Sequence, residues 1–199
     1  MDEVEGIGKR RRSKAQERLL STASELFYRE GIGATGVDTV SERASVSKRT
    51  LYNRYGGKDA LISAYLRDRD EQWWAYLRGV SEGIADPEGR LMMVFDAYGE
   101  WLSGHDFRGC AFANAQAEIA DPGHPALAVA RGHKERIEEH MATLAREAKY
   151  SKPEVLAEKL LLLLEGAVAM AVMRRTSGPL ETARSTALEL MDVHGRRVQ

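Results

Sequence analysis

Apolar residues recur at intervals of three and four along nearly the whole chain, the spacing of helices with one buried face. The first run consists of Ala15, Leu19, Ala23, Leu26 and Phe27. Ser13 and Gln16 precede and open this run with the spacing of a capping box, and Gly31 stops it. The pattern therefore predicts a first helix that begins after Ser13 and ends before Gly31.

Two short helices follow in the next 25 or so residues. Gly36 and Asp38 mark the start of the first, and Ser45 with Val46 forms the turn after it. Ser47 then caps a third helix, which ends at the glycine pair 56–57.

Longer amphipathic segments occupy the rest of the chain, so the sequence predicts an all-α fold of about nine helices. The expected ranges are 58–78, 87–102, 110–120, 125–149, a helix from about 153 through 173, and 178–194. Gly104 is expected to close the fifth helix, and Ser151 with Glu154 forms a second capping box at the start of the eighth.

The apolar run from Leu160 to Met173 covers almost every face of its helix and is interrupted only by Glu165. In a water-soluble protein such a helix is buried on more than one side. Either a two-fold related copy covers the second side through the last two helices, or the helix lies wholly inside a monomer. The run is shorter than a membrane span, which needs about 20 apolar residues.

Charge separates the two ends of the chain. Residues 9–58 contain 12 Lys and Arg against five acids, whereas the residues after Lys58 contain 17 basic and 22 acidic side chains. A basic segment of this size suits a polyanion such as DNA, because each phosphate contact releases condensed counterions. A solvated charged surface is the alternative explanation.

Residues 36–58 have the layout of a helix-turn-helix, with the third helix as the recognition helix. Small apolar residues at positions 40, 44, 46 and 51 are placed to pack the helices together. The polar side chains left for outward faces are Lys48, Arg49, Asn53 and Arg54. Lys48 and Arg49 on the first turn are the best candidates for base edges, since both residue types can address guanine O6 and N7.

The stretch GVDTVSERASVSKRTLY at 36–52, followed by YGGKDAL at 55–61, closely resembles the DNA-binding signature of the TetR family. This resemblance covers about residues 13–65. It implies a three-helix DNA-binding domain at 13–58 behind a basic arm at 1–12, and an effector-binding and dimerisation domain at 59–199. The chain departs from the family at Ser45, where Gly is usual, and at Val40 and Ser41, where Ile and Ala are usual; a positive φ at Ser45 would cost about 1 kcal/mol.

The resemblance implies that Thr50 and Tyr52 contact backbone phosphates, and that Lys58 places a charge at the start of the fourth helix. Ser47 fits the same site chemically, because a capped helix N-terminus attracts phosphate through its amides. The expected ligand is a double-stranded operator bound by a homodimer, and the arm either enters a minor groove or neutralises phosphates.

Several large side chains of the second domain either line an effector pocket or simply fill the core. They are Trp73, Trp74, Met92, Phe95, Trp101, Phe112 and Met170. The sequence does not identify the small molecule. The spacing of His105, His124, His133 and His140 suits no metal site, so no metal or cofactor is expected. Cys110 is either a redox-sensing thiol beside Arg108 or a small buried hydrophobe.

Enzymes and adaptors are the competing classes. No nucleophile elbow, zinc-hydrolase, Walker or dinucleotide motif is present, which argues against a small helical hydrolase. A protein-binding adaptor does not explain Lys48, Arg49 and the basic arm. A single cysteine and an acidic stretch at 1–8 without a signal-peptide pattern favour a cytoplasmic protein. The sequence therefore predicts a DNA-binding transcriptional repressor.

Overall fold

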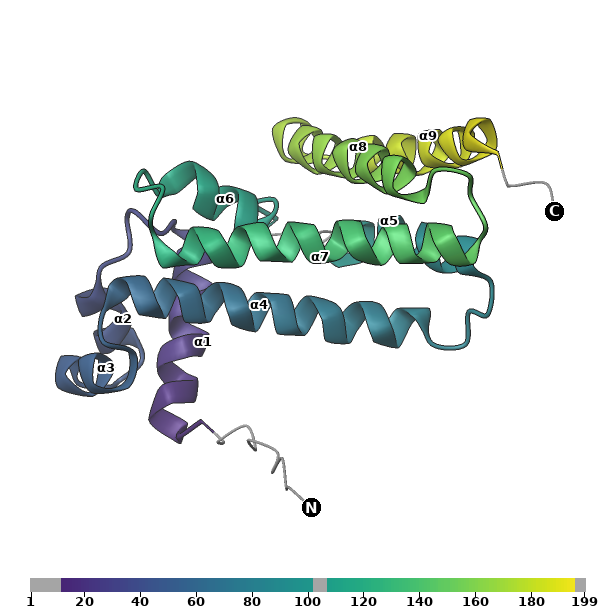
Figure 1. Cartoon of the computed structure of the whole chain (residues 1–199). Helices are drawn as coiled ribbons and strands as arrows, with labels where there is room; N and C mark the ends of the chain where they lie inside the picture. The colour runs from purple at the N-terminus through teal and green to yellow at the C-terminus, as the bar shows by residue number, and fades with distance from the viewer. Residues whose placement is uncertain (1–11, 102–106, 196–199) are drawn as a thin grey trace, which may run out of the picture. The chain divides into compact units, whose positions relative to one another are not determined.

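The computed structural model describes residues 12–101 and 107–195, and these are entirely helical apart from turns and short connections. Within the described ranges there are nine helices, which confirms the predicted all-α architecture (Figure 1). Their bounds are α1 Lys14–Arg29, α2 Val37–Arg43, α3 Lys48–Tyr55, α4 Lys58–Ser81, α5 Pro87–Trp101, α6 Ala111–Glu118, α7 Pro125–Glu147, α8 Pro153–Arg174 and α9 Gly178–His194. The basic arm, apart from Arg12, and the predicted stop at Gly104 lie outside the described residues.

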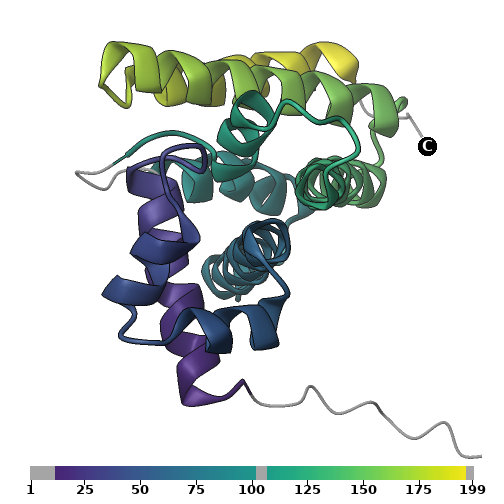
Figure 2. The same ribbon diagram turned by 90° about the vertical axis from the view of Figure 1, so that its left-hand side faces the viewer.

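The chain forms two compact units, the first ending at Tyr65 and the second beginning at Leu66, so that α4 contributes to both. In the first unit α1, α2 and α3 pack on one another (Figure 2). The predicted capping box of α1 is present, since Ser13 Oγ accepts from the amide of Gln16 and the Gln16 side chain accepts from the amide of Ser13. The buried centre of this unit includes Leu19, Leu26, Val40, Leu51 and Tyr65.

In the second unit α7 packs on α5, α6 and α8, and α9 packs on α5 and α8. The helices α8 and α9 run side by side in Figures 1 and 2. The fully buried side chains here include Leu66, Leu91, Ile137, Leu156 and Leu160. No helix among residues 12–101 and 107–195 is long and apolar enough to span a bilayer.

The predicted capping box at the start of α8 is wrong. Lys152 is the N-cap and makes no side-chain capping bond. The Ser151 hydroxyl donates instead to the carbonyl of His194 at 3.1 Å, and Glu154 pairs with Arg146 across the connection from α7. Tertiary partners have therefore taken both groups that the sequence pattern assigned to a local cap.

Candidate functional site

The turn between α2 and α3 determines where the recognition helix begins. The amide of Ser45 donates to Glu42 O and that of Val46 to Ser41 O, both at 3.0 Å, which is the bond pattern of a Schellman motif. Ser45 occupies its left-handed position with φ 51°. Ser45 therefore has the positive φ at which a residue other than glycine was expected to cost stability.

Capping and burial fix α3 locally. Ser47 Oγ accepts from the amide of Thr50 at 3.2 Å and lies 2.9 Å from the Thr50 hydroxyl. Leu51 is fully buried, and the Tyr55 hydroxyl donates to Gln16 O on α1 at 3.0 Å. Gly56, at φ 80°, ends the helix and lets the chain turn into α4. Inward-facing bonds and packing thus hold the helix while its other faces stay open.

The predicted DNA-contacting side chains are brought together on and beside this helix. The exposed side chains are those of Ser47, Lys48, Arg49, Tyr52, Asn53 and Arg54. Thr50 is half-buried beside its Ser47 partner, and Lys58 is half-buried at the first position of α4. Half of the Tyr52 side chain is exposed, although it carries a large aromatic ring. The group presents cations, amide and hydroxyls on one short element, as phosphate and base recognition requires.

Sequence reasoning did not identify the partner of Lys48. Its ammonium lies 2.5 Å from Asp38 Oδ1 at the start of α2, and both side chains are more than half exposed. An exposed ion pair of this kind contributes little to stability. Asp38 nevertheless competes with any phosphate or base for the same ammonium.

The second unit contains a small pocket among α4, α5, α6 and α7. Its lining residues are Arg69, Trp73, Tyr98, Trp101, Gly109, Cys110, Ala111, Phe112 and His133. Three of the aromatic residues expected from the sequence, Trp73, Trp101 and Phe112, meet there. Met92, Phe95 and Trp74 are buried elsewhere, while Met170 is 37% exposed on α8.

Ring contacts build the pocket wall. Trp73 meets Tyr98 at 4.4 Å between centroids and Trp101 at 5.9 Å, the latter nearly edge to face. Phe112 stacks on the His133 imidazole at 3.6 Å. Arg69 and Tyr98, which were not predicted, lie one helical turn from Trp73 and Trp101 on α4 and α5, so an i, i+4 and i, i+3 search from those residues would have found them.

Polar groups behind the rings are paired. His133 Nδ1 lies 2.7 Å from Asp70 Oδ1, and the other carboxylate oxygen of Asp70 pairs with Arg136. Burial lowers the pKa of His133 to about 4, although the hydrogen bond to Asp70 acts to raise it. The imidazole is therefore neutral at pH 7, and Nδ1–H donates to the carboxylate.

Cys110 is buried at the N-cap of α6 and has a charged neighbour. Lys134 Nζ lies 3.3 Å from its sulfur and pairs with Glu165 of α8. Burial opposes the charge on Lys134, but Tyr98, Cys110 and Glu165 together raise its pKa. The contact of Cys110 is thus with Lys134 of α7. Among the described residues no group of three metal-ligating side chains occurs.

Gly109 lets this segment approach α8 closely. Its φ is 84°, and a Cβ there would lie 2.9 Å from Val172 Cγ2. A side chain at position 109 would therefore need both a strained backbone and a displacement of the Val172 side chain.

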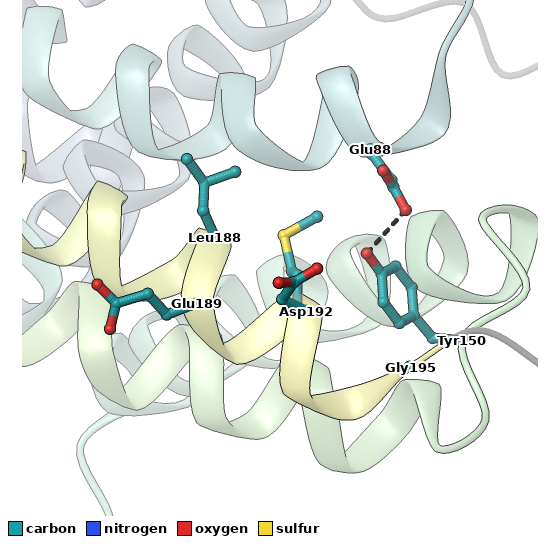
Figure 3. Close-up of a pocket in the computed structure, with 7 residues that line it drawn as sticks. Glu88, Tyr150, Leu188, Glu189, Asp192 and Gly195 are labelled. Atoms are coloured by element: carbon teal, nitrogen blue, oxygen red, sulfur yellow. Dashed lines mark hydrogen bonds between the residues drawn. The ribbon is translucent and has the colours of Figure 1, made fainter.

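A wider groove of about 620 Å³ lies between α5, the α7–α8 connection and α9 (Figure 3). The Tyr150 hydroxyl donates to Glu88 Oε1 across it at 2.7 Å. Glu189 and Asp192 of α9 add two more carboxylates beside Leu188.

Comparison with known proteins gives two family matches along the chain. Residues 19–65 match the family described as "Bacterial regulatory proteins, tetR family", and residues 87–187 match "Tetracyclin repressor-like, C-terminal domain". The second match alone spans about half of the chain.

Whole-chain relatives give the same result. A TetR-family transcriptional regulator from Streptomyces coelicolor is 30% identical, with a TM-score of 0.85 over 92% of this chain and 98% of that one. The HTH-type transcriptional regulator YjdC of Escherichia coli is 24% identical over 88% of this chain and 93% of its own length. The HTH-type transcriptional repressor DhaR of a Mycobacterium species is 23% identical over 90% and 93%. The chain thus belongs to the TetR family of helix-turn-helix transcriptional regulators, which are not enzymes.

Proposed function

We propose that this regulator is a repressor that binds a palindromic operator as a homodimer and is released or modulated by a small molecule. The observation that carries the DNA-binding part is α3, whose exposed side chains include two cations on the first turn above a fully buried Leu51. A repressor role is supported by DhaR, which is named as a repressor and matches along nearly the whole chain.

In this proposal Lys48 and Arg49 address base edges in the major groove, with Asn53 and Arg54 as further candidates. Thr50, Tyr52, Lys58 and the N-terminus of α3 at Ser47 bind phosphates. Base contacts carry the sequence preference, and phosphate contacts carry affinity for any duplex.

The dimer part rests on exposed apolar side chains of α8 and α9. Seven large apolar side chains are exposed among the described residues, and six of them lie on these two helices. They are Val155, Leu162, Met170, Met173, Leu188 and Val193. Leu188 borders the groove beside α5, whereas the four on α8 recur at helical spacing on one face. A second copy packed through α8 and α9 covers that face on both protomers at once.

The experiment for DNA recognition begins by selecting genomic fragments with the purified protein and sequencing them. We expect an inverted repeat, with half-sites about one helical turn or a multiple of it apart. Affinity should fall by roughly 0.9 log unit per log of salt for each phosphate contacted.

Variants then separate the two kinds of contact. Arg49→Ala should lose about 1–3 kcal/mol on the selected site and relax its sequence preference, whereas Thr50→Ala and Lys58→Ala should weaken all duplexes alike. Arg131→Ala, which removes an exposed cation of α7 in the other unit, is the charge-matched control. Equal losses of Arg49→Ala on selected and random DNA would disprove its role in reading bases.

Sedimentation equilibrium tests the dimer. Leu162→Arg places a charge on a side chain that is 67% exposed within the protomer, so it should leave the fold intact and raise the dimer dissociation constant. A wild-type monomer at micromolar concentration would contradict the proposal.

A further inference from the structure

The pocket among α4–α7 is lined by flat rings rather than by aliphatic side chains. Trp73, Tyr98 and Trp101 form one continuous aromatic cluster, and the Phe112–His133 stack forms another part of the wall. The space left between them is about 20 Å³, room for about one water molecule. Any larger ligand must separate the rings, and a planar molecule requires the smallest separation.

One lining residue carries a buried polar atom that lacks a hydrogen-bond partner among the described residues. Trp73 Nε1 is buried and lacks a hydrogen-bond acceptor among the described residues, and the side chain is only 3% exposed. An indole N–H is a donor only, so an acceptor atom is what it requires. Buried polar groups without a partner are uncommon, because leaving a donor unpaired is costly.

The neighbouring indole shows that this is a property of the position. Trp74 Nε1 donates to Asp70 Oδ1 at 2.9 Å, and its ring lies under the Arg136 guanidinium. Trp74 does not line the pocket. Of these two adjacent tryptophans, only the one that faces the pocket has an unused donor.

The charges around the pocket also favour an acceptor. Arg69 lies over the Trp101 ring, 5.4 Å from its centroid, and Lys134 lies 5.7 Å from the Tyr98 centroid. The described lining residues include no Asp or Glu. Asp70 and Glu165 pair with Arg136 and Lys134, and Glu100 accepts from the Tyr76 hydroxyl. A lining that holds an arginine and no described carboxylate favours an oxygen acceptor over a cation.

We infer that the pocket binds a flat aromatic molecule bearing an oxygen acceptor, a ring carboxylate or ring carbonyl, which accepts from Trp73 Nε1 while its ring inserts among Trp73, Tyr98, Trp101 and Phe112. This inference rests on the proposed function, because it gives the chemical class of the small molecule that modulates DNA binding.

The test measures the affinity of the full-length protein for four two-ring probes. Each probe is equilibrated with the protein by dialysis, and its concentration is read from its own absorbance. They are 2-naphthoate, 2-acetylnaphthalene, 2-methylnaphthalene and 2-naphthylmethylammonium. At least one of the two oxygen-bearing probes should bind roughly tenfold more tightly than the hydrocarbon and the cation, and which one binds more tightly distinguishes a carboxylate ligand from a carbonyl ligand.

Trp73→Phe keeps an aromatic ring and removes the donor. It should lower the affinity for 2-acetylnaphthalene by roughly 2- to 10-fold and that for 2-naphthoate by roughly tenfold or more, with a smaller change for 2-methylnaphthalene. Trp74→Phe is the matched control and should keep the wild-type order of affinities. If Trp73→Phe does not fold, Arg69→Gln decides, since it should weaken 2-naphthoate several-fold relative to 2-acetylnaphthalene.

Equal binding of all four probes, preference for the cation, an unchanged order of affinities in Trp73→Phe, or no binding below millimolar concentration would each overturn the inference. Duplex DNA binding by the same preparations distinguishes failure of this inference from failure of the proposed function. Protein that binds DNA but no oxygen-bearing probe rejects the ligand class alone, whereas protein that does not bind duplex DNA at low salt rejects the proposed function.

Discussion

The side chains assigned to DNA on α3 are neighbours in the sequence and are mostly exposed, whereas the pocket takes its lining from four helices and the loop before α6 and has room for about one water molecule. On α3 one cap and one buried leucine orient a whole row of polar groups. In the pocket each ring depends on the packing of another helix. A surface such as that of α3 can be predicted from local sequence, whereas a pocket such as this one forms only when distant helices pack together.

Leu51→Ala should have the largest effect and should separate the two units. Leu51 is fully buried in the first unit, so the substitution should cost that unit about 3–5 kcal/mol. All three tryptophans, at positions 73, 74 and 101, belong to the second unit. Urea unfolding followed by circular dichroism should therefore show an early transition that tryptophan fluorescence does not detect.

Tyr52→Ala is the control for that experiment. Tyr52 is next to Leu51 in the sequence, but half of its side chain is already exposed, so its loss should cost little stability. A matching shift of the fluorescence transition in Leu51→Ala would show that the two units unfold together, which would contradict their treatment as independent units.

Acid should act on the pocket rather than on α3. The pKa of His133 is lowered to about 4 in the folded protein from about 6.5 unfolded, so the unfolded chain binds more protons between these values. Stability should then fall as pH drops from 6.5 toward 4, by on the order of 2–3 kcal/mol from this residue.

The slope of stability against pH gives the measurement. His133→Phe keeps a ring against Phe112 and should flatten the slope, although His140, whose pKa is also lowered by burial, will leave part of it. An unchanged slope in His133→Phe would mean that the imidazole is not held neutral by its surroundings.

Ser45→Gly tests the turn that precedes α3. Glycine adopts φ 51° without the cost that a side chain imposes, so the variant should gain about 0.5–1 kcal/mol in chemical unfolding followed by circular dichroism. Ser45→Ala retains the unfavourable Cβ and should gain nothing. Equal stabilisation by both would place the cause outside the backbone conformation.

Asp38→Asn should have the smallest effect. Removing the carboxylate frees Lys48 and should raise affinity for any duplex by a few-fold, with almost no change in stability. Glu25→Gln breaks the comparable exposed pair with Arg29 on α1 and serves as the control in the same filter-binding titration. If both variants behave alike, the gain reflects net charge and not the release of Lys48.

The success of the sequence predictions follows the same division. The box at Ser13, the cap at Ser47 and the stop at Gly56 use partners within four residues, and the structure contains all three. The box at Ser151 failed because a carbonyl 43 residues away took the hydroxyl. Local signals predict an element's end only where no distant group competes for the same atoms.

The interior of the second unit was less predictable for a related reason. Periodicity predicts correctly that Phe95 and Trp73 face inward. It does not distinguish the two residues, although only Trp73 lines the pocket. Arg69 is one helical turn from Trp73, so spacing could have pointed to it, but His133 could not be chosen from spacing alone, because its place at the pocket depends on which helices become neighbours. Met170, apolar in the sequence, lies on the outer side of α8.

Close packing at Gly109 connects the pocket to α8. Because glycine has a hydrogen in place of a side chain, this residue lets the loop that leads into Cys110 pass close to Val172, where a Cβ would lie only 2.9 Å from Val172 Cγ2. If a ligand separates the rings and pushes residues 109–112 outward, they press on Val172 of α8, the helix whose exposed side chains include Leu162, Met170 and Met173. In the proposed dimer, a ligand bound inside one protomer would thereby alter the surface that meets the second copy.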